Sequence, residues 1–151
     1  MELNSTVAIV TGGNGGLGRR ICRALAEAGC QVVVVYAQSQ GEADEVVAQL
    51  QATGAQAGAI QCDVADPTQV DRLAQVTLER FGRIDILVND ASYNKWLPFP
   101  DLDGLTAGEW DKLLAINLTG PVLVITAVAV TMHRPGHGRT LHLSLIHVSE
   151  P

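Results

Sequence analysis

Cysteine is scarce in this sequence. Its 151 residues contain three cysteines, Cys22, Cys30 and Cys62. An odd number at scattered positions is typical neither of a disulfide framework nor of a cysteine-based metal site. Free cysteines of this kind are typical of a reducing compartment, so we expect a cytoplasmic protein.

Basic residues and long apolar runs are scarce as well. Ten Lys and Arg stand against 16 Asp and Glu, for a net charge of −6, and Arg19-Arg20 is the longest basic cluster. A groove for nucleic acid needs a basic stripe, so we expect no nucleic-acid partner. The longest apolar run, 122–130, is too short to span a bilayer, which predicts no membrane association.

Histidines with metal-binding spacing are also lacking. His133 and His137 flank a helix-breaking Pro-Gly pair, while His142 and His147 flank the end of an expected strand. Metal ligation needs three or four convergent groups, which these positions do not offer. We therefore expect no metal site.

Glycine, by contrast, is concentrated near the start of the chain. Residues 11–18 place five glycines between an apolar run at 7–10 and a helix-like segment at 19–28. Glycine permits positive φ and close backbone approach, and the following helix directs unpaired N–H groups and its positive dipole end at the same point. The alternative is a glycine-rich surface turn. We predict a site for the diphosphate of a dinucleotide, formed by Thr11, Gly12, Asn14, Gly15, Gly16, Leu17 and Gly18.

Apolar runs alternate with amphipathic segments along the rest of the chain. We expect strands at 7–10, 32–35, 57–61, 84–89 and 139–143, and helices at 16–28, 42–52, 66–81 and 106–131. Asp66 before Pro67 predicts an N-cap, Thr106 with Glu109 predicts a capping box, and Gly120-Pro121 suggests a kink. This alternation predicts an α/β fold with a doubly wound parallel sheet between two helical layers.

Four segments in this order resemble the short-chain dehydrogenase/reductase family, over about residues 4–142. The segments are Thr11-Gly12-x-x-x-Gly16-x-Gly18, Cys62-Asp63-Val64, Asn89-Asp90-Ala91-Ser92 and Asn117-Leu118-Thr119-Gly120. The resemblance implies a Rossmann-like sheet of strand order 3-2-1-4-5, incomplete at its C-terminal edge, with the nucleotide at the carboxyl ends of the strands. It also implies NAD(P)-dependent oxidoreduction of a carbonyl/alcohol pair and a homo-oligomeric full-length protein.

The resemblance also implies roles for individual residues. Cys62, Asp63 and Val64 would border the adenine ring, and Asn89, Asp90 and Ala91 would lie beside the nicotinamide half of the cofactor. Asn117 would support a proton relay through water. Without the resemblance, Asp63 could simply cap a turn and Asn89 could be an ordinary turn residue. An asparagine inside a helix, such as Asn117, usually needs a hydrogen-bonding partner.

Two positions depart from the family pattern of Asn-Asn-Ala-Gly. Asp90 replaces the second asparagine and adds a negative charge near the cofactor, and Ser92 replaces the glycine. We expect both substitutions to be tolerated, but they make tight cofactor binding less expected.

The end of the second expected strand bears on the choice between NAD and NADP. An acidic side chain about twenty residues after the glycines would accept hydrogen bonds from the ribose of NAD and repel a 2′-phosphate. Residues 36–39 read Tyr-Ala-Gln-Ser and hold no carboxylate, which favours NADP. Gly15 and Gln38 stand where similar proteins often carry Arg or Lys, so NAD remains the alternative.

The catalytic residues of the family are missing from this chain. No tyrosine is followed four residues later by lysine, and Ser144 matches the first of two serines, whereas Leu145 falls on the second, catalytic one. We therefore expect a fragment that is inactive by itself. A non-catalytic dinucleotide-binding module would share every motif found here, and a truncation product without a function of its own is a third reading.

Residues 143–151 closely resemble the translation of a transposase adapter used in sequencing libraries. We therefore expect a nucleotide-binding domain at 1–142 and a non-native tail at 143–151. The alternative is a natural short variant whose tail is genuine. Loss of later elements would also leave the fifth strand unpaired and a helix face uncovered, including Leu113, Ile116, Val124 and Val128, which predicts self-association.

Overall fold

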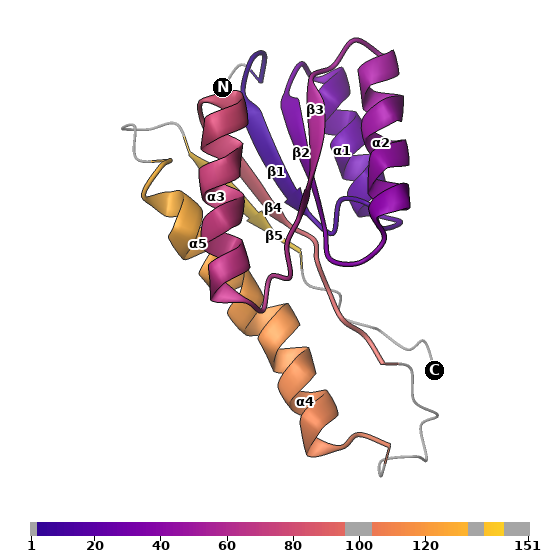
Figure 1. Ribbon diagram of the computed structural model, residues 1–151, viewed down its shortest axis with the longest axis vertical. Coiled ribbons are helices and arrows are strands. Elements are labelled where there is room, and N and C mark those ends of the chain that lie inside the picture. Colours follow the sequence, from indigo (N-terminus) through magenta and orange to yellow (C-terminus); the bar gives the residue numbers. More distant parts are fainter. Residues whose placement is uncertain (1–2, 96–103, 133–137, 144–151) are drawn as a thin grey trace, which may run out of the picture.

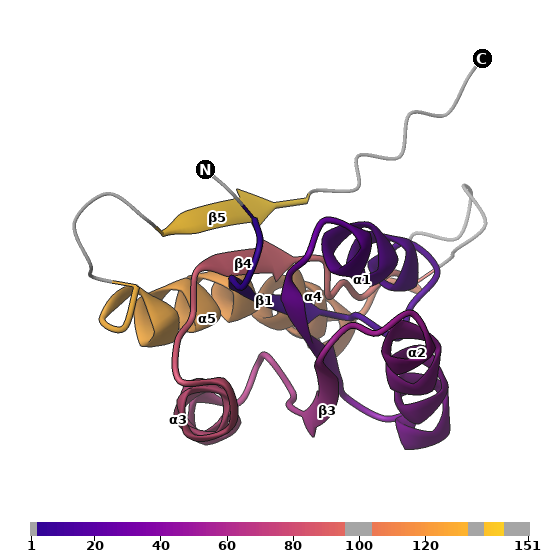
Figure 2. The same ribbon diagram turned by 90° about the horizontal axis from the view of Figure 1, so that it is seen from above.

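Five parallel strands form one sheet between two layers of helices (Figures 1 and 2). The computed structural model describes residues 3–95, 104–132 and 138–143. The strands are β1 (Val7–Thr11), β2 (Gln31–Tyr36), β3 (Ala57–Gln61), β4 (Ile86–Asn89) and β5 (Arg139–His142). The helices are α1 (Gly18–Glu27), α2 (Gln40–Ala52), α3 (Pro67–Phe81), α4 (Ala107–Leu114), the π-helical segment η1 (Ala115–Thr119) and α5 (Gly120–Ala129). The order β3-β2-β1-β4-β5 confirms the predicted doubly wound α/β sheet.

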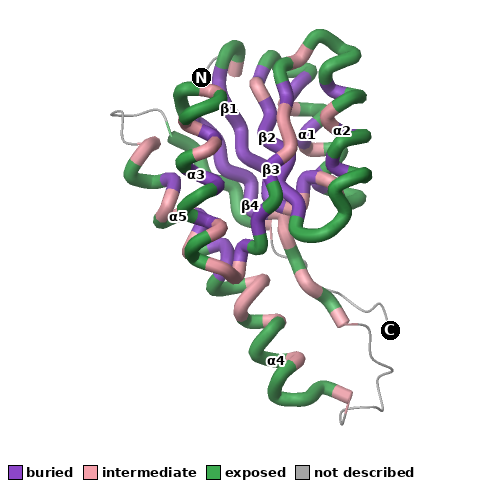
Figure 3. The backbone as a smooth tube through the Cα atoms, viewed as in Figure 1, coloured by how far each residue is buried: buried purple, intermediate pink, exposed green. Residues whose placement is uncertain are grey.

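The sheet is buried on both faces in its centre, as the purple strands in Figure 3 show. All five residues of β1 are buried, and Val32 to Val35 of β2 are at most 1% exposed. Alternate residues pack on opposite sides, so Ile9 and Val33 join the core under α3 and α5, whereas Val10 and Val34 join the core under α1 and α2. This two-sided burial explains why the strands read as continuous apolar runs.

Local signals set most of the helix boundaries. The Asp66 carboxylate accepts hydrogen bonds from the N–H groups of Thr68 and Gln69, and α3 ends at Gly82 in the left-handed region, with φ 78°. Helix α1 begins at Gly18, two residues later than the sequence predicts, because the residues before it form the glycine turn. The N-terminal half of the predicted capping box is present, since Thr106 accepts from the Glu109 N–H.

The long helix expected at 106–131 is formed by α4, η1 and α5. Its change of hydrogen-bonding pattern falls at Ala115–Thr119, just before the Gly120-Pro121 pair that suggested a kink. Pro121 has no N–H to donate, and π-helical turns of this kind are frequent at functional sites. By length and composition alone, the stretch Ala107–Ala129 is long and apolar enough to cross a membrane. This is weak evidence for a membrane span, because core helices of soluble proteins share this property.

The uncovered face of this helix differs from the predicted one. Val124 and Val128 are buried, because α5 packs on β4 and α3. The exposed apolar residues follow a spacing of four along another side, which places them on one stripe. This stripe consists of Trp110, Leu114, Leu118 and Val122, which are between 40% and 61% exposed.

Strand β5 pairs in parallel with β4 and ends the sheet within the described residues. Its register joins Ile86 to Arg139 and Asn89 to His142, and all four of its residues are exposed. Figure 2 shows β5 outside the helical layers, so that this edge is the less covered side of the sheet. The predicted open fifth-strand edge is therefore present in the described part of the chain.

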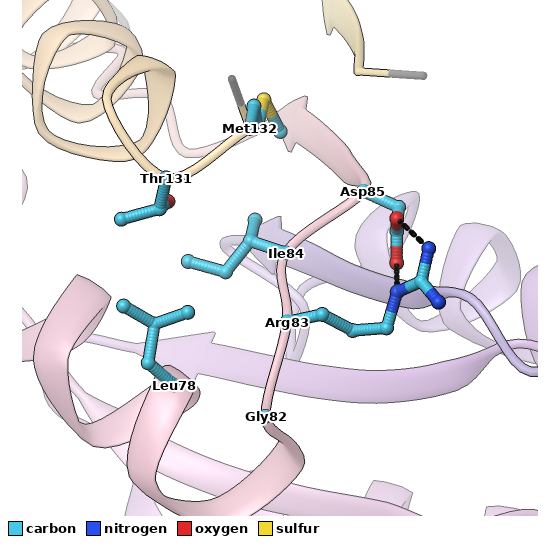
Figure 4. A pocket seen from close by; sticks show the side chains of 7 residues that line it. All are labelled: Leu78, Gly82, Arg83, Ile84, Asp85, Thr131 and Met132. Carbon is cyan, nitrogen blue, oxygen red and sulfur yellow. Dashed lines mark hydrogen bonds and ion pairs between the residues drawn. The ribbon is translucent and has the colours of Figure 1, made fainter. Parts of the chain in front are cut away.

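Asp85 ties together the amino ends of β1 and β4. Its side chain is buried and accepts a hydrogen bond of 2.9 Å from the Val7 N–H, while Arg83 binds both carboxylate oxygens (Figure 4). The hydrogen bonds that Arg83 donates to the Asp85 carboxylate, together with the charge of that carboxylate, raise the pKa of Arg83. A cavity of about 430 Å³ lies beside this pair, lined also by Leu78, Ile84 and Met132. It lies at the end of the sheet opposite the glycine turn.

Replacing Asp85 with alanine leaves the buried Val7 N–H without its acceptor. We expect Asp85→Ala to lower the free energy of unfolding by about 2 kcal/mol, the typical cost of an unsatisfied buried donor. Asp85→Asn is the matched control, because its amide oxygen can still accept from the Val7 N–H while the ion pair with the half-exposed Arg83 is lost, so it should destabilise the chain less. Urea denaturation monitored by circular dichroism measures both, and equal losses would contradict this role of Asp85.

Candidate nucleotide-binding site

Thr11 joins the glycine turn to the segment that follows β4. Its side chain is buried, and its hydroxyl oxygen accepts hydrogen bonds of 3.1 Å from the N–H groups of both Asp90 and Ala91. The hydroxyl also lies 3.4 Å from the Val88 carbonyl, to which it donates. Two sequence segments predicted to contact one cofactor are thus held together at the carboxyl ends of neighbouring strands.

Two glycines are required by this arrangement. Gly12 has φ +66°, and a Cβ there would lie 2.9 Å from the Ala91 Cα. A Cβ on Gly18 would run into the Gly12 carbonyl oxygen and would lie 2.9 Å from the Asp90 carboxylate. A side chain at either position would push the turn away from β4 or from α1.

The remaining part of the turn is open. A Cβ on Gly16 would meet nothing within 4 Å among the described residues, and Leu17 is 46% exposed. Helix α1 has no side-chain N-cap, and within the described chain no hydrogen bond uses the N–H of Gly16 or Leu17. Unpaired N–H groups at a helix N-terminus are suited to a diphosphate, so the turn fits the group that the sequence predicted for it.

Asn14 and Arg19 border the open turn on the side of α2. The Arg19 guanidinium donates to the Asn14 carbonyl at 2.8 Å and to the Gly15 carbonyl at 3.3 Å. The Asn14 side-chain amide donates to Glu42, in the first turn of α2, at 3.3 Å. Gln38 lies on the exposed connection between β2 and α2. The cation Arg19 and the anion Glu42 therefore both lie near the end of β2. Glu42 was not predicted from the sequence as a site residue.

Cys62, Asp63 and Val64 follow β3 at the same edge of the sheet. Cys62 is buried, and this burial, together with the charge of Asp63, raises the pKa of its thiol to about 12, so the thiol remains protonated. Asp63 is exposed and accepts a hydrogen bond from the Ala65 N–H, which is the turn-capping contact considered as its alternative role. Its predicted contact with adenine stays a prediction.

Asn89 ends β4 with a buried side chain. Neither its amide nitrogen nor its oxygen has a hydrogen-bonding partner among the described residues. Buried polar groups are nearly always paired, and an orphaned amide at the carboxyl end of a central strand fits a site that receives a polar ligand.

Asn117 holds the loop after β4 against η1. Its amide oxygen accepts from the Tyr93 N–H at 2.7 Å, and its amide nitrogen donates to the Tyr93 carbonyl at 2.8 Å. This pairing supplies the partner expected for an asparagine inside a helix and positions the residues that follow Asn89 to Ser92. The proposed proton relay stays a prediction, and Ser144 lies outside the described residues.

Tyr93 is a member of this region that the sequence analysis did not identify. Its hydroxyl donates to Glu109 at 2.8 Å, and Lys112 lies 4.0 Å above its ring. The hydrogen bond from Tyr93 and the nearby Lys95 hold the pKa of the Glu109 carboxyl below its usual value. The sequence signal for Tyr93 is its position directly after the Asn89 to Ser92 segment. Its side-chain partners Glu109 and Lys112 lie 16 and 19 residues away in the sequence, so local patterns do not reveal these contacts.

Comparison with known proteins identifies the family. The family model for short chain dehydrogenases matches residues 6–147. A 3-oxoacyl-[acyl-carrier-protein] reductase from Synechocystis sp. is 39% identical over 144 residues, which cover 95% of this chain and 57% of that protein. The chain thus spans little more than half the length of this relative.

Solved structures agree with the sequence comparison. A short chain dehydrogenase from Burkholderia cenocepacia in complex with NADP has a TM-score of 0.84 at 34% identity, covering 94% of this chain and 56% of that one. A metagenomic short-chain oxidoreductase in complex with NADP has a TM-score of 0.86 at 30% identity, covering all of this chain and 67% of that one. The chain, with its glycine turn joined to β4 through Thr11, belongs to the short-chain dehydrogenase family.

Proposed function

We propose that these residues form the cofactor-binding part of an NAD(P)-dependent oxidoreductase that transfers hydride between nicotinamide and a carbonyl/alcohol pair. The observation that carries the proposal is the open glycine turn, where unpaired N–H groups at the N-terminus of α1 are held beside the residues that follow β4. The nicotinamide would supply the hydride chemistry. The residues of this chain would bind the diphosphate at the glycine turn, where the glycines leave room for it, and would orient the cofactor along the sheet edge.

The proton donor of the reaction is not among these residues. No tyrosine in the sequence is followed four positions later by lysine, and Asn117 is already engaged with Tyr93. We infer that the chain binds nucleotide without turnover. A non-catalytic dinucleotide-binding module would behave in the same way.

This absence predicts an outcome for a direct assay. The purified chain, mixed with NADPH or NADP⁺ and a panel of carbonyls and alcohols, should show no change in absorbance of the reduced nicotinamide above the protein-free rate. The physical reason is that general acid or base catalysis requires a positioned group of suitable pKa. Cofactor-dependent turnover well above background would contradict the expectation.

The partners of the protein follow from the same proposal. The exposed apolar stripe of Trp110, Leu114, Leu118 and Val122 supports a homo-oligomeric full-length protein, because exposed apolar patches often mark interaction sites. Family membership supports a soluble protein, and we propose that it resides in the cytoplasm. Residues 143–151 remain proposed as a non-native tail.

Nucleotide binding is tested by thermal melts of the chain with increasing NADPH and NADH. A ligand that binds the folded state alone raises the melting temperature in a dose-dependent way. We expect this rise for the unchanged chain and its loss in Gly18→Ala, whose Cβ collides with the Gly12 carbonyl. Gly108→Ala is the matched control, because a Cβ there meets nothing within 4 Å among the described residues and lies outside the site. A cooperative melt that neither cofactor moves would refute the proposed function.

The preference for NADP is tested through the charged pair beside the turn. We propose that the Arg19 guanidinium, held at the mouth of the turn, attracts the 2′-phosphate and that Glu42 opposes it. Arg19→Gln should weaken NADPH binding about tenfold, because it removes one partly screened attraction to the 2′-phosphate, and it should change NADH binding little. Glu42→Gln should strengthen NADPH binding, because it removes one repulsion. Fluorescence titration gives the dissociation constants, and equal effects on both cofactors would contradict this assignment.

A further inference from the structure

Asp90 occupies part of the helix terminus that the diphosphate would use. Its carboxylate lies beside Gly18, the first residue of α1, and its Oδ2 lies 2.9 Å from the position that a Gly18 Cβ would take. Its backbone N–H donates to the Thr11 hydroxyl oxygen at 3.1 Å, which holds the residue at this edge of the sheet. A carboxylate therefore lies against the same positive dipole end that favours a phosphate.

Few groups offset this charge. Burial of the Asp90 carboxyl raises its pKa, the neighbouring Gly18 backbone N–H lowers it, and no basic side chain in the described residues contributes. The nearest cation of the turn, Arg19, is bonded to the Asn14 and Gly15 carbonyls. The Cys22 thiol on α1 is the other titratable group that Asp90 affects, and burial followed by the charge of Asp90 raises its pKa to about 12. The charge of Asp90 thus reaches the buried thiol of Cys22 on α1.

A dinucleotide brings two more negative charges to this space. An ionised Asp90 would repel them, whereas a protonated carboxyl would not, and the similar family carries a neutral asparagine at this position. We propose that Asp90 couples nucleotide binding to a proton, so that the dinucleotide binds tightly with Asp90 protonated and more weakly with Asp90 ionised. This inference rests on the proposed nucleotide-binding function and deepens it.

The direction of the pH dependence follows from linkage. The bound diphosphate disfavours the charged form of Asp90, so the pKa of its carboxyl is higher in the complex than in the free chain, where burial has already raised it. Binding therefore takes up a proton at any pH between these two pKa values. Within that window the dissociation constant should increase about tenfold per pH unit, and it should be constant below and above the window.

The experiment measures NAD⁺ binding by calorimetry from about pH 5 to about pH 8, the range in which a raised carboxyl pKa would be seen. NAD⁺ is used because it lacks the 2′-phosphate of NADP⁺, which itself titrates near neutral pH. Each titration is repeated in two buffers of different ionisation enthalpy, which gives the number of protons taken up. The proteins are the unchanged chain, Asp90→Asn, and Asp71→Asn, an exposed position on α3 that changes the net charge equally.

We expect the unchanged chain and Asp71→Asn to bind more weakly as pH rises, with proton uptake. Asp90→Asn should bind at least about tenfold more tightly at the high end, without proton uptake and without pH dependence. Parallel curves for all three proteins, or tighter binding by Asp90→Asn with no proton uptake in the unchanged chain, would overturn the inference and leave the proposed function standing. Failure of a folded Asp90→Asn chain to bind either NAD⁺ or NADP⁺ at any pH would instead refute the proposed function.

Discussion

The whole site depends on how closely three backbone segments approach one another. Gly12 lies against Ala91, and Gly18 lies against the Gly12 carbonyl, with no room for a side chain between them. Because β1 and β4 are neighbours and parallel, their carboxyl ends deliver these segments to the same edge, and the Thr11 hydroxyl fixes their distance. The N–H groups of Gly16 and Leu17, which have no partner within the described chain, belong to the turn that this contact holds in place.

Backbone groups also resolve an electrostatic problem. The chain carries a net charge of −6, yet the ligand that its turn fits is an anion. Oriented N–H groups and the dipole of α1 provide a local positive potential that does not depend on the overall charge. Arg19 adds a cation at one side, whereas Glu42 and Asp90 add carboxylates, so binding strength and selectivity are set by a few charges near the turn.

The segment after β4 connects the nucleotide site with the long helix. Asn117 pairs with both backbone groups of Tyr93, and Tyr93 in turn reaches Glu109 and Lys112 of α4. These contacts hold α4 beside the exit of β4, although α4 extends beyond the sheet (Figure 1). The stripe of Trp110, Leu114, Leu118 and Val122 stays exposed on this helix and leaves an apolar surface to cover.

The sequence by itself determined the order and type of the elements, because apolar runs, N-caps and glycine stops act locally. Asp66 before Pro67 is an example, since the structure confirms the predicted N-cap and the helix ends at Phe81, as the predicted range 66–81 has it. It also identified the glycine turn, since its residue types are needed by backbone conformation alone. Only the tertiary structure decided which helix face is covered, so that Val124 and Val128 proved buried and Leu118 exposed. The partners of Asp90 and Tyr93 were likewise decided by the fold, because contacts between residues far apart in the sequence arise only when the strands are set in register.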